Sequence, residues 1–161
     1  MKIEEGIEVQ GKFHVVVKDK EGNIKFEREY PNLITNAGKA EIAKLITADV
    51  GGTAFDYIAI GDDDGTTLAL DASNTALGNE LARAAATGTT TTTNVTDDTM
   101  QLQASFTGSA YTIEEIGVFN ASTGGTMLSR ILTGTITLQS TDTITITYKL
   151  TAVSYTHLRA H

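Results

Sequence analysis

The chain has 161 residues, with 12 lysines and arginines against 20 aspartates and glutamates, no cysteine and one proline. A formal net charge of −8 argues against a nucleic-acid partner, because phosphate contacts require clustered lysine and arginine. The lack of cysteine excludes disulfides, thiolate metal sites and a cysteine nucleophile. No apolar run approaches the roughly 20 residues that span a bilayer, and the first residues lack a signal-peptide core, so we expect no membrane partner.

Threonine is the compositional feature that indicates a fold class. Many of the 27 threonines alternate with isoleucine, leucine or valine. Threonine is β-branched and suits a pleated surface that has one face in water. The composition therefore predicts a mainly β protein.

The first elements predicted in chain order are a hairpin and a helix. Gly11–Asp19 and Ile24–Tyr30 are alternating runs joined by a glycine-asparagine turn, and Pro31 ends the second run. Thr35 or Asn36 can cap a helix that ends before two consecutive glycines. Its expected apolar stripe consists of Ala40, Ile42, Ala43, Leu45 and Ile46.

The rest of the chain is predicted to form strands, with a second, weaker helical turn over Thr75–Arg83. The five threonines of 89–93 fit a mobile loop, an edge strand or an O-glycosylated spot, and a threonine-rich strand is the simplest account of them. The expected strands cover Phe55–Ile60, Met100–Thr107, Tyr111–Phe119 with a bulge near Glu114 and Glu115, Thr126–Leu132, and Thr143–Leu150. Short strands separated by frequent turns predict an antiparallel β-sandwich or barrel with one or two short helices, in a single β-rich domain over residues 1–152.

Residues 153–161 break this alternation. The string Val153–His161 resembles the in-frame translation of a sequencing-library adapter, which implies a gene recovered from shotgun or environmental DNA. We therefore expect this tail to be non-native and to add neither a strand nor a site. Two of the three histidines lie in it, which leaves His14 as the only histidine to consider.

Few residues suggest catalysis. His14 has the opposite phase to its apolar neighbours in a strand, which favours a surface histidine over a catalytic base. Glu114 and Glu115 are neighbours in a strand and should point to opposite faces, one solvated and the other paired or at a bulge. If one is buried, Arg130 or Arg83 is the expected counter-ion.

The best suggestion of a metal site is the acidic run Asp62–Asp64, which lies between two glycines. Calcium prefers clustered carboxylates, but the bidentate glutamate that closes an EF-hand loop is absent, so we interpret the run as a solvated turn. Asp97 and Asp98 are interpreted as another turn. We assign no catalytic, cofactor-binding or metal-binding residue.

Three groups of segments together carry a family resemblance. They are Asn32–Lys39 with Ala43–Leu45, Tyr57–Gly61 with Thr75–Arg83, and Ile113–Ala121 with Gly124–Arg130 and Thr141–Tyr148. In this order they resemble a widespread family of small virion structural proteins of tailed bacteriophages, described variously as tail-fibre, minor structural or head-associated proteins. The resemblance covers about Gly11 to Thr151. The sequence departs from the family pattern at Asp62–Asp64, where such proteins more often have glycine and threonine.

The resemblance implies a non-enzymatic component of a phage particle, most simply a capsid decoration or head-associated protein. Its partners would be further copies of itself in a symmetric homo-oligomer and the major capsid or tail proteins. Its location would be the virion, and the host cytoplasm during assembly. The alternatives are a tail-fibre or baseplate component that binds a receptor or carbohydrate, and, third, an enzyme such as a polysaccharide depolymerase, which would need paired acids in a cleft.

Overall fold

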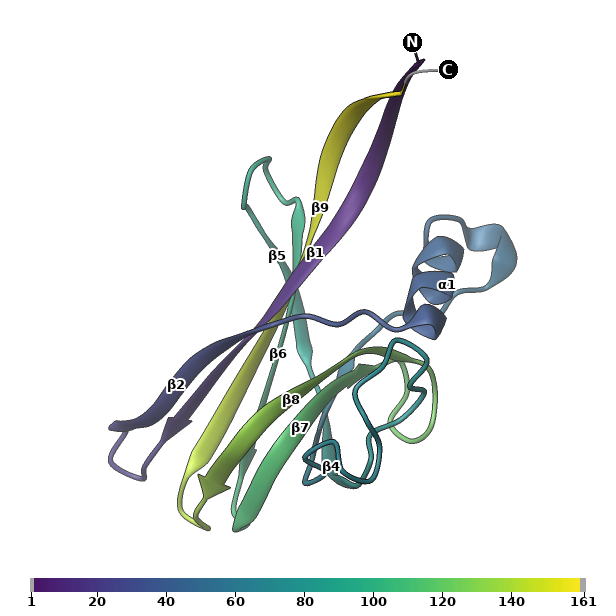
Figure 1. Ribbon diagram of the computed structural model, residues 1–161. Helices are drawn as coiled ribbons and strands as arrows, with labels where there is room; N and C mark the ends of the chain where they lie inside the picture. Colours follow the sequence, from purple (N-terminus) through teal and green to yellow (C-terminus); the bar gives the residue numbers. More distant parts are fainter. Residues whose placement is uncertain (1, 160–161) are drawn as a thin grey trace.

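Two antiparallel sheets form the body of the chain in the computed structural model, which describes the backbone of residues 2–159 and the side chains of residues 4–154. Sheet A has the strand order β2-β1-β9-β6-β5, and sheet B has the order β4-β3-β7-β8 (Figure 1). The strands of sheet A are β1 (Lys2–Lys18), β2 (Ile24–Pro31), β5 (Thr87–Thr91), β6 (Thr99–Thr107) and β9 (Thr143–Arg159). Those of sheet B are β3 (Tyr57–Gly61), β4 (Glu80–Ala85), β7 (Tyr111–Phe119) and β8 (Met127–Leu138). The sheets do not close, so the molecule is a sandwich and not a barrel.

The core lies between the two sheets and follows the predicted alternation. Phe13 of β1 and Tyr148 of β9 are fully buried, with ring centroids 4.6 Å apart. The other fully buried members from β9 and sheet B include Ile144, Ile146, Ile58, Ile60, Ile113, Ile116 and Val118. Burial of each such side chain contributes about 1.5–3 kcal/mol before conformational entropy is subtracted.

Threonine, serine and glutamine side chains line the opposite face of sheet A, as the composition predicts. Across β6 and β9, hydroxyl groups pair directly opposite each other, with Oγ–Oγ distances of 2.9 Å for Ser105 and Thr145 and 2.8 Å for Thr107 and Thr143. Such cross-strand pairs stabilise a sheet and fix its register. The interpretation of the threonine run as a strand is confirmed for Thr89–Thr91, which end β5 at the edge of sheet A, whereas Thr92 and Thr93 lie beyond the strand.

The predicted helix is confirmed as α1 (Asn36–Leu45), but its buried face differs from the predicted one. Thr35 caps the helix, because its Oγ1 accepts a hydrogen bond from the Gly38 N–H at 2.9 Å. The buried residues are Gly38 and Glu41, whereas Ile46 of the expected stripe is 85% exposed. Gly38 allows the helix backbone to lie directly on the backbone of β8, so the contact does not require an apolar stripe.

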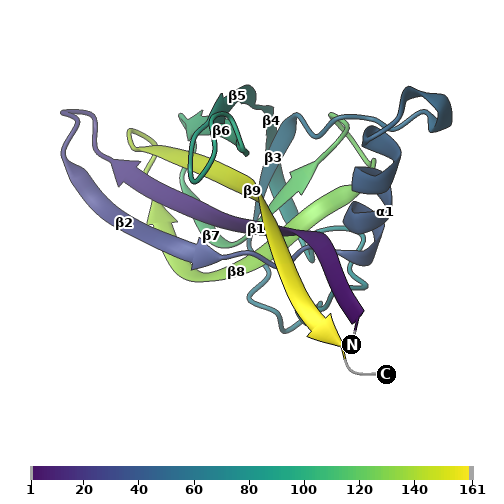
Figure 2. The same ribbon diagram turned by 90° about the horizontal axis from the view of Figure 1, so that it is seen from above.

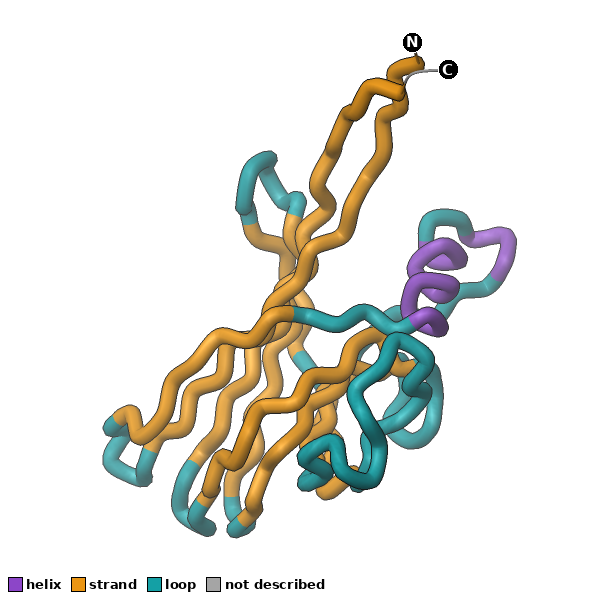
Figure 3. The backbone as a smooth tube through the Cα atoms, viewed as in Figure 1, coloured by secondary structure: helices purple, strands orange, loops and turns teal. Residues whose placement is uncertain are grey.

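The second predicted helical turn is wrong. Thr75–Asn79 belong to a loop, and Glu80–Ala85 pair with β3 as strand β4. Pairing with β3 outweighs the weak local helical spacing of Leu77 and Leu81. The second short helix is instead the 3₁₀ turn η1 (Ala48–Val50), which follows α1 and projects to one side of the sheets (Figure 3). Within residues 2–159, neither helix has the length and apolar content to cross a bilayer.

Strands β1 and β9 extend beyond the sandwich as a two-stranded ribbon (Figures 1 and 2). β9 continues to Arg159, which pairs with Lys2, so the expectation that residues 153–161 add no strand is wrong for 153–159. Pairing with β1 satisfies the backbone hydrogen-bonding groups of this segment. A strand can form in this way even where the side chains do not alternate between apolar and polar. The first strand likewise begins at Lys2 and not at the predicted Gly11.

Candidate functional site

The centre of the most elaborate side-chain network is Arg130 on β8, which is fully buried. Its Nε donates to Glu115 Oε2 at 2.9 Å, and its Nη2 donates to Asp63 Oδ2 at 3.2 Å. Its Nη1 donates to Asn74 Oδ1 and to the Leu68 carbonyl, both at 2.9 Å. Arginine is suited to this position because its planar fork keeps several donors in fixed directions.

Glu115 connects this network to the loop of residues 62–79, here called the strap. Its two carboxylate oxygens accept the N–H groups of Gly78 at 3.0 Å and Asn79 at 2.8 Å. The ladder between β7 and β8 shifts register after Ile113, at the predicted bulge. One glutamate of the pair is therefore buried, and of the two arginines considered as its counter-ion, Arg130 is the one that pairs with it. The other, Glu114, is half-buried and accepts a hydrogen bond from the Thr135 hydroxyl.

Asp63 corrects the interpretation of the acidic run as a solvated turn. Asp62 and Asp64 are exposed, but Asp63 is buried and accepts the N–H groups of Thr67 at 3.1 Å and Leu68 at 2.9 Å. Burial disfavours its charged form, but these N–H donors and the Arg130 charge outweigh burial and lower the pKa of Asp63. Among the residues whose side chains are described, no group of three or more His, Asp or Glu is placed to hold a metal ion.

The strap covers a second apolar cluster on the outside of sheet B. Leu77 of the strap packs with Ala59, Phe119 and Met127, all of them buried. The other arginine considered, Arg83, lies over the Phe119 ring with its guanidinium carbon 3.6 Å from the ring centroid. The ion-pair network therefore fastens a loop over apolar surface, which is a structural role.

Asp97 and Asp98 lie in a turn, as predicted, and Asp98 organises it. Its carboxylate accepts the N–H groups of Thr93, Asn94 and Val95 at 2.8–2.9 Å. These backbone donors, first among them that of Val95, lower the pKa of Asp98 well below its ordinary value of 3.8. A carboxyl group whose pKa is lower in the folded than in the unfolded chain stabilises the fold above its unfolded pKa and loses that effect as pH falls.

We expect Asp98→Asn to make the free energy of unfolding depend less on pH in the acid range. The free energy of unfolding of the parent should fall steadily as pH drops below 3.8, whereas the variant should start lower and fall less. Urea denaturation at a series of pH values measures this difference. Asp97→Asn is the control: its carboxylate accepts one hydroxyl hydrogen bond, from Thr90, so its removal should change the slope less. Equal slopes for the parent and Asp98→Asn would contradict the prediction.

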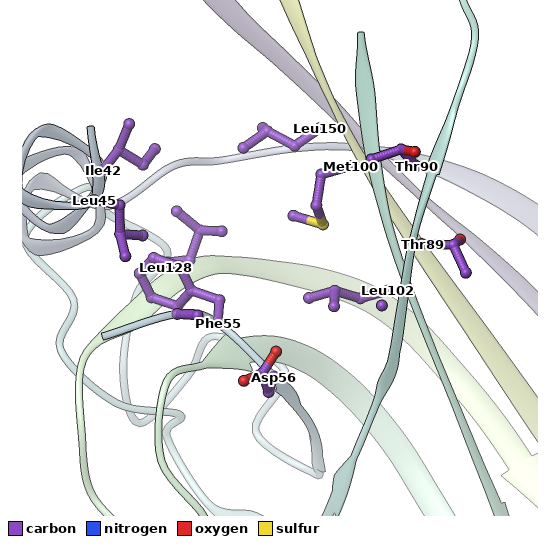
Figure 4. A pocket seen from close by; sticks show the side chains of 12 residues that line it. Ile42, Leu45, Phe55, Asp56, Thr89, Thr90, Met100, Leu102, Leu128 and Leu150 are labelled. Carbon is purple, nitrogen blue, oxygen red and sulfur yellow. The ribbon is translucent and has the colours of Figure 1, made fainter. Parts of the chain in front are cut away.

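An open apolar groove of about 490 Å³ lies between α1 and the inner face of sheet A (Figure 4). Here the sheets diverge, and side chains of both layers face the gap. Its lining includes Ile42, Leu45, Phe55, Met100, Leu102, Leu128 and Leu150. Two residues of the apolar stripe predicted for the helix, Ile42 and Leu45, line this groove, so the stripe is the feature of the sequence that points to it.

His14 lies on the outer face of sheet A, as predicted for a surface histidine. Its Nε2 is 3.4 Å from Glu27 Oε2, and both side chains are substantially exposed. The carboxylates of the buried network are on sheet B and the strap, so the structure does not bring His14 together with Glu115 or Asp63. Among the residues whose side chains are described, no serine forms a hydrogen bond with His14.

Comparison with known proteins identifies no relative. No family model, no curated protein and no solved structure matches the chain. The class that the fold itself defines is a β-sandwich with a strap fastened by buried ion pairs and a projecting ribbon.

Proposed function

We propose that the chain is a non-enzymatic structural component of a tailed-phage virion, most simply a capsid decoration or head-associated protein. The sequence resemblance supports this proposal, and so does the role of the polar residues described above. Arg130, Glu115 and Asp63 hold the strap on the sheet, and cross-strand pairs of hydroxyl groups stabilise sheet A. A particle component needs such a rigid body, since its task is to keep neighbours in place.

The single observation that carries the proposal is the end of β1 that projects beyond the sandwich, where residues 2–8 pair only with residues 153–159. Those residues belong to the tail that we expect to be non-native, so this end of β1 would lack its partner strand in the native protein. A two-stranded ribbon has no core of its own and is marginally stable in water unless another surface covers it. Ile7 in this ribbon is 74% exposed, and its backbone partner is Ser154. A neighbouring subunit would supply the missing cover, and such subunits commonly repeat around a symmetry axis.

Electron cryomicroscopy of particles of the phage that carries this gene tests the proposal. We expect density for the sandwich at symmetry-related positions on the capsid, with the ribbon against another copy or the major capsid protein. Density in the baseplate or tail fibre would favour the alternative, a tail component that binds a receptor or carbohydrate. Mass spectrometry of the same purified particles provides the control, and absence of the chain from them would contradict both forms of the proposal.

A further inference from the structure

A polar depression lies on the outer face of sheet A, where β1, β9 and β6 run side by side. It encloses about 230 Å³ and is lined by Lys12, His14, Glu29, Gln101, Gln103, Thr147 and Lys149. Two neighbouring depressions share residues with it. One, of about 290 Å³, continues past Lys12 and Lys149 to Thr93, and the other, of about 300 Å³, continues past His14 and Gln103 to Lys18. Together they form a groove along the strands, here called the outer groove.

The middle of the outer groove contains two lysines, of which the fold pairs only one with a carboxylate. Lys12 and Lys149 are directly opposite each other in the β1–β9 ladder, an arrangement that destabilises a sheet. Lys12 reaches Glu29 at 3.4 Å, and both side chains are largely exposed. Lys149 is half-buried, and no described carboxylate lies within ion-pair distance of it. On the β6 side, the residue opposite Lys149 in the ladder is the neutral Gln101.

The position of the groove limits what can bind there. Along most of the groove, the backbone is already paired on both sides, for residues 12–18 of β1 and residues 143–151 of β9. An extended peptide that binds by adding a strand needs a free edge, so this face offers only side chains. The side chains of the outer groove are ammonium, amide and hydroxyl groups, together with the His14 imidazole and the carboxylates of Glu27 and Glu29. Glu29 lies against Lys12 and Glu27 against His14, which leaves the Lys149 ammonium to pair with an anion. The amide and hydroxyl groups donate to and accept from neutral hydroxyl groups.

We propose that the outer groove binds an acidic polysaccharide that carries carboxylate groups on its sugar rings. Lys149 and Lys12 hold one carboxylate, and Gln101, Gln103 and the Thr147 hydroxyl contact ring hydroxyls. Residues two apart along a strand are separated by about 6.6 Å, so a groove that runs from Thr93 to Lys18 spans several side-chain positions and accommodates a chain of sugars. This inference does not rest on the proposed virion role, and either can fail alone.

Isothermal titration of the full chain with short oligogalacturonates tests the proposal. The titration is done near 0.15 M salt, where the Debye length of about 8 Å screens the distant acidic residues of this negatively charged chain. We expect saturable binding by the parent. We expect Lys149→Gln to weaken binding about tenfold, because it removes a charge-assisted hydrogen bond. Lys20→Gln removes the same charge in the turn between β1 and β2 and should bind as the parent does.

Each other outcome of the titration overturns the proposal. Absence of binding by the parent excludes a site for this class of ligand, and equal weakening by Lys149→Gln and Lys20→Gln indicates general electrostatic attraction only. Equal binding of neutral maltooligosaccharides removes the role of the carboxylate, and equal binding of polyglutamate removes the role of the sugar. Thermal denaturation checks the fold, since Lys149→Gln should unfold no lower than the parent. Lys12→Gln, at an exposed side chain, provides a second variant that should also weaken binding.

Discussion

Replacement of Arg130 by methionine should cost about 3–5 kcal/mol of unfolding free energy, the largest effect that we expect from one substitution in this chain. Methionine fills part of the volume but leaves the carboxylates of Glu115 and Asp63 buried without their cation. It also leaves the Leu68 carbonyl and the Asn74 side chain without the donors of Arg130. Urea denaturation followed by circular dichroism measures the loss.

Two further variants show whether the unpaired charge causes this loss. Arg28→Met removes an exposed arginine from β2 and should change the unfolding free energy by no more than about 0.5 kcal/mol. Glu115→Gln added to Arg130→Met should recover part of the loss, because the neutral amide oxygen still accepts from the Asn79 N–H and needs no counter-ion. If Arg130→Met were as stable as the parent, the network would not be what fastens the strap.

Gly38→Ala should destabilise the chain by about 1–3 kcal/mol by forcing α1 away from β8. A Cβ atom at this position would lie 2.7 Å from the Leu128 carbonyl oxygen and 2.8 Å from the Leu128 Cα. Both atoms belong to the backbone of a strand inside the fold, so neither can move as a flexible side chain does. Thermal denaturation measures the loss, and hydrogen exchange of the α1 amides locates it.

The matched control for this substitution is Gly88→Ala in edge strand β5. The nearest atom to a Cβ there is Leu102 Cδ2, at an ordinary contact distance of 3.6 Å. Alanine should leave stability unchanged or raise it slightly, because it restricts the unfolded chain more than glycine does. Equal effects of the two substitutions would show that the close approach of α1 to β8 does not constrain position 38.

The features predicted correctly from the sequence are those that depend on local spacing. Alternation of apolar with polar residues located most of the strands, although not β4, and the side-chain oxygen of Thr35 located the start of the helix. The break in alternation around Glu114 located the bulge, and elementary electrostatics reduced the counter-ion of a buried glutamate to Arg130 or Arg83, of which the structure shows Arg130. Each of these inferences needs information from only a few neighbouring residues or one charge pair.

The features missed from the sequence depend on contacts between segments distant in the chain. Asp63 is buried because the strap folds back over β8, and nothing in three consecutive aspartates reveals that path. Leu77 was assigned to a helix because its spacing with Leu81 is helical, although the two residues belong to different elements. The groove beside α1 was missed because an apolar stripe on a helix ordinarily means burial, and here it faces a gap between sheets.

The way in which the strap is fastened has a consequence for how this surface can diversify. Apart from the side chains of Asp63 and Asn74, the groups of the strap that Arg130 and Glu115 hold are main-chain carbonyl and amide groups, which every amino acid except proline provides in full. Exposed positions such as Thr66, Ser73 and Ala76 can therefore change while the anchor stays intact. Related chains could therefore differ in the surface residues of the strap while the β-sandwich beneath it stays the same.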